Sequence, residues 1–301
     1  MEWLKLWLKA VRAPFFSASL IPALVGAALS SRVGYFHPMR LFFALTVVVL
    51  CQAGANLVND YFDALGSDLI NKRVTPFSGG SRLIQQGLLS RQNYFLGALL
   101  IYGTGLVVLL VLSYLYHNIT ILGLGVSGII LGVIYSTTKT YGMGRGWGEL
   151  AVGVAFGPLA TAGSYLLQAN YVIPEAFLAG VPVGFLIMGV LILNEIPDYE
   201  ADRKVGKLNW VVRAGGSEGK GVWVYLTVIC LAYLTVGVGV FLQIFPEKIL
   251  FSCLTIPLAT WIFLKARQFR GDIREIIPAM AGNIGLHFFT GILISIGLWW
   301  K

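Results

Sequence analysis

The chain has 301 residues, of which 57% are hydrophobic and only 12% are charged. Its mean hydropathy is +0.77. A soluble domain carries roughly 25% charged residues. This composition therefore excludes an ordinary soluble globular protein and indicates a chain that lies in a lipid bilayer.

The chain begins with a short stretch in which aromatic and basic residues are interleaved. Trp3 and Trp7 lie close to Lys5 and Lys9, a pattern typical of an amphipathic helix at a membrane surface. No cleavable signal peptide is evident in this stretch. We therefore expect the helix to remain attached to the protein.

Nine apolar runs follow, each close to the ~20 residues that a bilayer core requires. We expect an all-α, polytopic membrane protein of about nine transmembrane helices, with residues 1–301 forming a single domain. The runs cover residues 14–30, 41–58, 93–113, 118–136, 149–168, 176–195, 221–243, 247–264 and 276–299.

The charged residues predict how the chain is oriented in the membrane. If nine spans alternate from a cytoplasmic N-terminus, 18 of the 22 Lys and Arg residues lie on the cytoplasmic side. This is the positive-inside pattern, and it predicts a multi-pass cell-membrane protein whose N-terminus and long loops are cytoplasmic. The net charge of +8 then reflects orientation and gives no support for binding to nucleic acid.

An acidic motif, "NLVNDYFDALGSD", follows the second apolar run directly. Asn56, Asp60 and Asp63 are spaced four and three residues apart, so on a helix they share one face. Carboxylates at that spacing repel one another, and the repulsion grows near a low-dielectric boundary unless a cation is present.

A second motif, "NEIPDYEADRKVGK", ends the sixth apolar run and repeats the pattern. Asp198 and Asp202 are four residues apart, and Asn194 precedes them. In both places a basic pair and then "GGS" follow the acids, at 79–81 and at 215–217. We interpret this as a weak internal repeat in parallel orientation.

Two carboxylate groups without histidine or thiolate favour a hard cation, and Mg²⁺ first among these. Mg²⁺ is usually held by one or two carboxylates together with substrate phosphates, so a phosphorylated ligand is expected. Basic side chains on the same side of the membrane are available to bind its oxygens. These are Lys72, Arg73, Arg82, Lys139, Arg145, Arg203, Lys204 and Lys207.

The two motifs resemble the aspartate-rich motifs of the UbiA superfamily of intramembrane prenyltransferases. The stretch "IYSTTKTYGMGRGWGELAVGVAFGPLATAGSYLLQ" is similar to the middle region of its menaquinone branch, the 1,4-dihydroxy-2-naphthoate polyprenyltransferases. The resemblance spans the chain from "VRAPFFSASLIPALVGAAL" to the last apolar run.

The resemblance implies nine helices around a central cavity that cytoplasmic loops cap, with Mg²⁺ between the motifs and an isoprenyl diphosphate. The resemblance also implies that an aromatic acceptor is prenylated there, and it favours a dihydroxynaphthoate. By motif match, the metal-side and catalytic residues are Asp60, Asp63, Asp198 and Asp202, with Asn56 and Asp68 as further metal-side residues. Tyr135 matches a tyrosine near the reacting carbon. The residues expected at the diphosphate are Asn56, Arg73, Arg82, Lys139, Arg145, Asn194 and Lys207.

Two other functions remain open from the sequence. One is an enzyme of the same superfamily with another acceptor: 4-hydroxybenzoate, a chlorophyll-type ring, haem or an archaeal glycerophosphate lipid. The other is a cation-coupled transporter, because acids in membrane helices also mark ion pathways. Transporters place such sites near the bilayer midplane, whereas these acids lie at one rim.

Overall fold

A computed structural model describes residues 2–137, 146–216 and 220–300. Within them, nine helical segments are long and apolar enough to cross a membrane, which confirms the expected all-α, multi-pass architecture. The helices are α1 (Glu2–Ala10), α2 (Ser17–Arg32), α3 (Pro38–Asp63), α4 (Ser67–Ile70), α5 (Arg91–Leu115), α6 (Ile119–Thr137), α7 (Gly148–Val154), α8 (Ala160–Ala169), α9 (Pro174–Lys204), α10 (Trp210–Arg213), α11 (Lys220–Phe241), α12 (Ile256–Ala266) and α13 (Ile273–Trp299).

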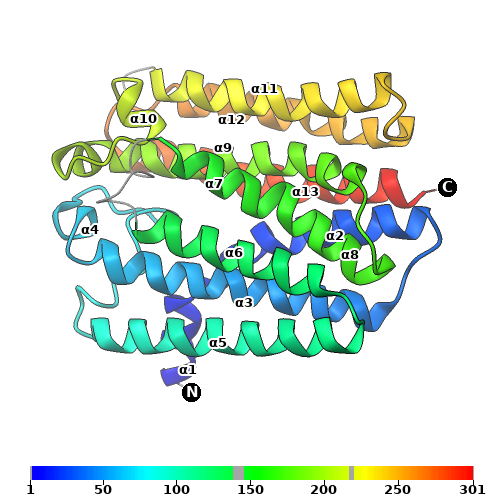
Figure 1. The fold of residues 1–301 in the computed structure, drawn as a ribbon. Helices are drawn as coiled ribbons and strands as arrows, with labels where there is room; N and C mark the ends of the chain where they lie inside the picture. Colours follow the sequence, from blue (N-terminus) through cyan, green and yellow to red (C-terminus); the bar gives the residue numbers. More distant parts are fainter. Residues whose placement is uncertain (1, 138–145, 217–219, 301) are drawn as a thin grey trace.

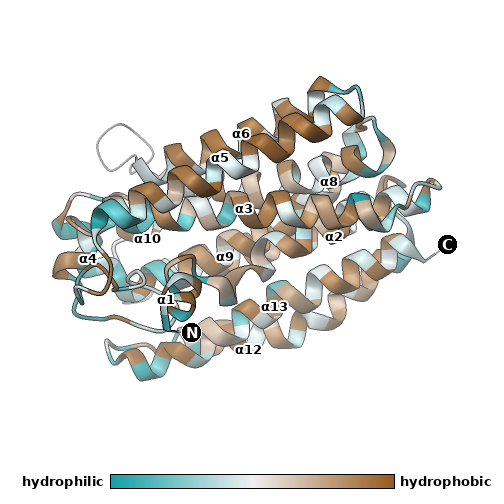
Figure 2. Ribbon diagram, turned by 90° about the horizontal axis from the view of Figure 1, so that it is seen from below, coloured by the Kyte–Doolittle hydropathy of each residue, from teal (hydrophilic) through white to brown (hydrophobic). Residues whose placement is uncertain are grey.

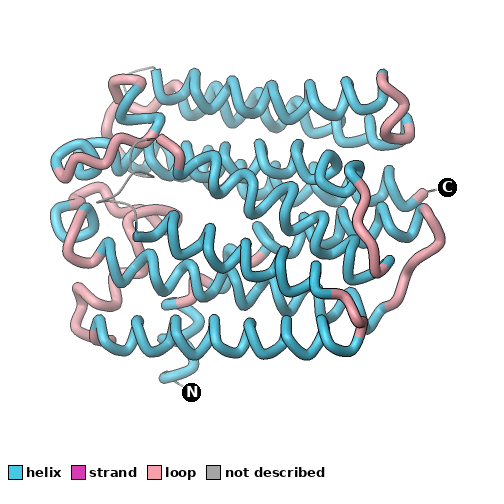
Figure 3. Tube along the Cα trace, in the orientation of Figure 1, coloured by secondary structure: helices cyan, strands magenta, loops and turns pink. Residues whose placement is uncertain are grey.

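The spanning helices lie side by side, and their connecting loops gather at two opposite ends (Figures 1 and 3). The short helices α4 and α10 lie at one end, and the C-terminus lies at the other (Figure 1). We call these the motif end and the far end. Two spans are interrupted: the π-helical segment η3 (Ala155–Leu159) joins α7 to α8, and the 3-10 segment η4 (Glu247–Thr255) precedes α12.

The helices form two groups with their own apolar contacts. In the N-terminal group, α3 packs against α2, α5 and α6. In the C-terminal group, α9 packs against α11 and α13, and α12 packs against α13. The helices α2 and α8 contact each other, and α2 also contacts α13, so they join the two groups. The space between α3, α6 and the α7–α8 span is where the site described below is found.

Hydrophobic residues cover the middle of the molecule, and hydrophilic residues are concentrated at the ends of the helices (Figure 2). Large apolar side chains on the outer faces are exposed, among them Leu99 and Leu100 on α5 and Phe241 on α11. Water would penalise such a surface, whereas lipid tails solvate it. The chain is therefore an integral membrane protein.

Small residues bring the α7–α8 span close to α9. A Cβ atom added at Gly157 would lie 2.6 Å from the carbonyl oxygen of Gly180 and 2.6 Å from the Cα of Gly184. Backbones approach this closely only where side chains are absent, as in other small-residue contacts between membrane helices. Because Pro158 follows Gly157, the helix relaxes there into the π-helical turn η3. This turn presents Ala155 and Phe156 to the interior.

Candidate active site

The first acidic motif lies in the last two turns of α3 and in α4. The side chains of Asp60, Asp63 and Asp68 are all buried, although each carries a carboxyl group. Burial raises the pKa of Asp68 to about 6, and repulsion from Asp63 and Asp60 adds to this rise. The three carboxyl groups are therefore close enough to interact. The spacing predicted this for Asp60 and Asp63, and the family resemblance implied it for Asp68.

The loop after α4 covers these acids. The backbone N–H of Ser81 donates to Asp60 Oδ2 at 3.1 Å. A Cβ atom at Gly80 would lie 2.3 Å from Asp68 Oδ2, and Gly80 has a left-handed φ of +77°. Both facts require glycine, because any side chain would displace the Asp68 carboxylate and strain the backbone. The "GGS" turn thus brings backbone against the acids.

Arg12 also contacts the first motif. Its guanidinium forms an ion pair with Asp60 and donates to Asn59 Oδ1 at 3.2 Å. Burial lowers the pKa of Arg12, but the attraction and hydrogen bond of Asp60, together with the attraction of Asp68 and Asp63, outweigh burial, and the pKa is raised. A cationic group therefore already lies beside the carboxylates in this structure, which shows that their field stabilises positive charge.

The second motif lies near the end of α9, where Pro197 is accommodated inside the helix. Asp198 Oδ1 accepts hydrogen bonds from Asn71 Nδ2 at 2.7 Å and from Ser78 Oγ at 3.2 Å. Asp202 Oδ2 accepts from Asn209 Nδ2 at 2.8 Å. Neutral donors therefore orient both carboxylates of this motif.

Lys207 connects the two motifs electrostatically. Its Nζ lies 3.5 Å from Asp202 Oδ1. Burial lowers the pKa of Lys207, but the combined attraction of the surrounding groups, Asp202 first and Asp63 second, outweighs burial, so the pKa lies well above its usual value. The ammonium group is therefore charged and lies in the field of carboxylates from both motifs.

The two motifs face one site. Asn71 and Ser78 belong to the loop that follows the first motif, yet both donate to Asp198 of the second. The same loop contacts Asp60 through Ser81. A single loop of about ten residues thus spans from one acidic group to the other, as expected if both bind the same ligand.

A cavity of about 160 Å³ lies beside the acids. Asn56, Asn194 and Tyr135 line it, together with Arg12 and Asn59. Asn56 also donates from Nδ2 to the Val11 carbonyl at 2.8 Å. The structure therefore brings three of the predicted residues to one chamber, which we call the reaction chamber.

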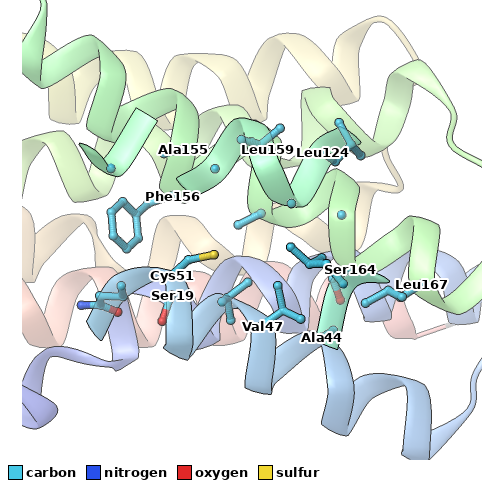
Figure 4. Close-up of a pocket in the computed structure, with 18 of the residues that line it drawn as sticks. Ser19, Ala44, Val47, Cys51, Leu124, Ala155, Phe156, Leu159, Ser164 and Leu167 are labelled. Atoms are coloured by element: carbon cyan, nitrogen blue, oxygen red, sulfur yellow. The ribbon is translucent and has the colours of Figure 1, made fainter. Parts of the chain in front are cut away.

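A second, mostly apolar cavity of about 100 Å³ continues from the reaction chamber between α3, α6 and α8. Phe156 lies at one end of it, and Ala44 and Leu167 lie toward the other (Figure 4). Along α3 its lining runs from Ala55 to Ala44, which at 1.5 Å per residue is roughly 16 Å. We call this cavity the apolar channel.

The far end of the apolar channel is closed. Leu109, Ile121 and Leu166 line it there and are almost completely buried in a packed cluster. Beyond this cluster, Arg40 Nη1 donates to the Gln168 carbonyl at 2.8 Å. The channel is therefore blind toward the far end of the molecule.

Of the residues that the structure describes, the others predicted to bind the diphosphate do not line the reaction chamber. Arg82 donates to the backbone carbonyls of Asp68 and Asn71, so it holds the covering loop while its charge stays near Asp68. The Arg73 guanidinium lies beside Gly271, near the start of α13. Lys139 and Arg145 lie outside the residues that the structure describes.

Several residues at the site were not among the predicted ligands. Arg12, Asn59, Asn71, Ser78 and Asn209 contact the acids through the bonds given above. Arg12 had a usable signal, because it is a basic residue directly before an apolar span. The amide and hydroxyl donors had none, since short polar side chains in loops are common.

The donor set suits Mg²⁺ in kind. The oxygens of buried carboxylates and neighbouring carboxamides are what this ion prefers. Among the described residues, no three His, Cys, Asp or Glu side chains are grouped to hold one ion. That is compatible with Mg²⁺, which needs only one or two carboxylates when phosphate oxygens and water complete its shell.

Comparison with protein families gives a match over residues 19–289 to the UbiA prenyltransferase family. A 2-carboxy-1,4-naphthoquinone phytyltransferase from Synechocystis is 29% identical and covers 98% of this chain and 94% of its own length. A 1,4-dihydroxy-2-naphthoate octaprenyltransferase from Escherichia coli is 33% identical over 75% of each chain.

Solved structures show the same fold. A UbiA homolog from Archaeoglobus fulgidus bound to DMAPP and Mg²⁺ superposes with a TM-score of 0.68 over 96% of this chain and 99% of its own, at 17% identity. A UbiA homolog from Aeropyrum pernix also gives a TM-score of 0.68, over 93% of this chain and 97% of its own, at 18% identity.

Proposed function

Because the chain belongs to the UbiA prenyltransferase family and is a prenyltransferase, we propose that it transfers an isoprenyl group from an isoprenyl diphosphate to 1,4-dihydroxy-2-naphthoate, with Mg²⁺, in menaquinone biosynthesis. The observation that carries this proposal is the pair of buried acidic motifs, joined by one loop, at the mouth of a blind apolar channel. A metal-bound diphosphate fits the acids, and a hydrocarbon tail fits the channel.

In this proposal the carboxylates of Asp60, Asp63, Asp68, Asp198 and Asp202 hold Mg²⁺. When bound, the metal neutralises the negative charge that develops on the leaving diphosphate. Lys207 adds a fixed positive charge between the motifs, available to donate to a phosphate oxygen. Asp60 pairs with Arg12 and Asp202 pairs with Lys207, so these two basic side chains are in place before substrate arrives.

The transfer begins when the allylic C–O bond breaks and its electron pair leaves with the diphosphate. The apolar side chains of the reaction chamber keep water from the allylic cation, and Tyr135 offers it a π face. An electron-rich ring carbon of the acceptor then forms the new C–C bond. Loss of CO₂ from the naphthoate restores aromaticity.

The tail length can be tested at a glycine of the channel. Among the described residues, no atom lies within 4 Å of a Cβ built at Gly163, which lines the channel. Gly163→Leu should therefore fit without a clash and occupy space where the tail lies. An extended isoprene unit is roughly 5 Å long at ordinary bond lengths, so the blind channel of roughly 16 Å holds about three units.

We expect Gly163→Leu to lower activity with geranylgeranyl diphosphate by about tenfold and to spare dimethylallyl diphosphate. The matched control is Gly123→Leu on α6, where a Cβ is equally uncrowded but Gly123 is exposed on the outer face. Equal loss with both donors, or the same loss in Gly123→Leu, would place the tail elsewhere.

The acceptor is tested with purified protein, Mg²⁺ and one allylic diphosphate. We expect 1,4-dihydroxy-2-naphthoate to be prenylated, with diphosphate released, and 4-hydroxybenzoate to give little product. This acceptor is supported by the names of three relatives that are 29–33% identical to this chain. Prenylation of hydroxybenzoate or of a glycerophosphate instead would refute the acceptor and leave the donor chemistry intact.

We also propose that the motif end is cytoplasmic, because Lys and Arg are concentrated there. In a cysteine-free background, a cysteine at the exposed Val205 should react with a membrane-impermeant reagent only from the cytoplasmic side. A cysteine at the exposed His117, at the far end, should react only from outside. The reverse pattern would invert the proposed topology.

A further inference from the structure

A junction of shared lining residues joins the reaction chamber to the apolar channel. Five residues line both cavities: Gln52, Ala55, Gly132, Ala155 and Phe156. Of these five, Gln52 alone has a polar side chain that forms strong hydrogen bonds. It lies on α3, two turns before Asp60, and is only 5% exposed.

The orientation of the Gln52 amide is fixed by its neighbour. Its Nε2 donates to the Phe15 carbonyl at 2.9 Å. The reverse orientation would place two acceptors face to face, so Oε1 must point the other way. Among the described residues, Oε1 is a buried atom that has no hydrogen-bond partner.

An unpartnered buried carbonyl oxygen is costly, and native proteins rarely leave one without a purpose. A ligand must donate a hydrogen bond to satisfy it. An isoprenyl diphosphate has no N–H or O–H at neutral pH, and its hydrocarbon chain has none. A phenolic acceptor has a hydroxyl. In the proposed function, the junction is where its ring meets the reacting end of the isoprenyl group.

Resting on the proposed function, we infer that Gln52 is a positioning residue for the aromatic acceptor, whose hydroxyl donates to Oε1. In 1,4-dihydroxy-2-naphthoate the 1-hydroxyl is bonded internally to the adjacent carboxylate, so the free donor is the 4-hydroxyl. Bound in this way, the ring is held beside the channel mouth with its electron-rich edge toward the allylic carbon. The same bond selects hydroxylated rings over rings without a donor.

The test pairs a side-chain change with a substrate change. Gln52→Met keeps the volume of the side chain and removes Oε1. The analogue 4-methoxy-1-hydroxy-2-naphthoate keeps electron donation to the ring and loses the free hydroxyl. In the unaltered protein, kcat/KM should be roughly tenfold to a hundredfold higher for the dihydroxy acceptor than for the methoxy analogue. In Gln52→Met the two acceptors should differ by less than about threefold.

A matched control separates this role from a structural one. Gln168 is also a buried glutamine that anchors backbone, but both ends of its amide are bonded to His37, at 2.8 Å and 3.2 Å. Gln168→Met should lower stability and keep the full preference for the dihydroxy acceptor. If Gln52→Met also keeps that preference, or if it raises KM for the diphosphate donor alone, Gln52 acts only through Phe15 and the inference is wrong.

A measurement on the unaltered protein keeps the test decisive if Gln52→Met does not fold. The methoxy analogue should compete with 1,4-dihydroxy-2-naphthoate at least about tenfold more weakly than the parent compound itself. Equal competition overturns the role of Gln52 and leaves the proposed function standing. No prenylation of any aromatic acceptor would instead overturn the proposed function.

Discussion

The first and second acidic motifs lie at corresponding ends of α3 and α9, but different neighbours hold them. The first has three buried carboxyl groups, a guanidinium from Arg12 and the backbone of the covering loop. In the second, Asp198 and Asp202 accept from neutral side chains, and Lys207 pairs with Asp202. Glu195 is buried one turn before Asp198. The first motif thus has its acids under the covering loop, whereas neutral side chains orient Asp198 and Asp202 of the second.

The glycine pairs after each motif show the same contrast. Gly79 and Gly80 have left-handed φ angles, as do Gly215 and Gly216. A Cβ at Gly80 would meet the Asp68 carboxylate, whereas a Cβ at Gly216 would meet the Tyr199 ring at 2.6 Å. The repeated turn therefore lies against a ligand-binding group in the first copy and against a packing group in the second.

The largest effect is expected where both motifs must act together. Asp60→Asn and Asp198→Asn should each lower kcat by on the order of 10³-fold. The double variant should be little worse than either single variant, because the first substitution already inactivates the shared site. Prenyl transfer by the purified variants measures this. Losses that multiply in the double variant would mean that the motifs work independently.

Lys207 should give the next largest effect. Lys207→Met removes the charge that lies between Asp202 and Asp63, and we expect kcat/KM for the donor to fall by about tenfold to a hundredfold. Lys204→Met is the matched control, since Lys204 is exposed at the same end of α9. An equal effect in both variants would reduce the role of Lys207 to general surface charge.

Gly80→Ala should weaken the metal site specifically. Its Cβ displaces the Asp68 carboxylate, so the Mg²⁺ concentration for half-maximal activity should rise by about tenfold. Gly87→Ala is the control, because Gly87 has a similar φ of +69° and no described atom within 4 Å of its Cβ. A shift of the same size in Gly87→Ala would assign the effect to backbone strain.

Gly216→Ala should have the smallest effect on chemistry. Its Cβ contacts the Tyr199 ring, and its φ of +98° is unfavourable for alanine, so we expect a loss of stability of about 1–2 kcal/mol. The midpoint of thermal inactivation should fall, while the Mg²⁺ requirement stays unchanged. A changed Mg²⁺ requirement would show that the second turn also supports the metal site.

The amino-acid sequence predicted the spans well, because a bilayer fixes both their length and their apolar character. Each of the nine runs lies within a few residues of a spanning helix. The acids were placed correctly at helix ends, since α3 and α9 simply continue past their apolar parts to Asp63 and Lys204. Helical spacing alone determined that Asp60 and Asp63 are close together.

The rest of the site depends on contacts between residues far apart in the chain. Asn71 reaches Asp198 across 127 positions, and Arg12 reaches Asp60 across 48. No spacing rule connects such pairs, because the path of a loop is set by tertiary packing. Gln52 was missed for another reason: it lies within an apolar run, where its unpartnered oxygen becomes evident only once the cavities are known.

The most direct test of the central claim, that the two motifs form one Mg²⁺-dependent diphosphate site, is calorimetric titration of the detergent-solubilised protein with geranylgeranyl diphosphate. We predict saturable binding in the presence of Mg²⁺, none after chelation, and none in either Asp60→Asn or Asp198→Asn. Binding that is equally tight without Mg²⁺, or that survives the loss of either motif, would contradict the claim.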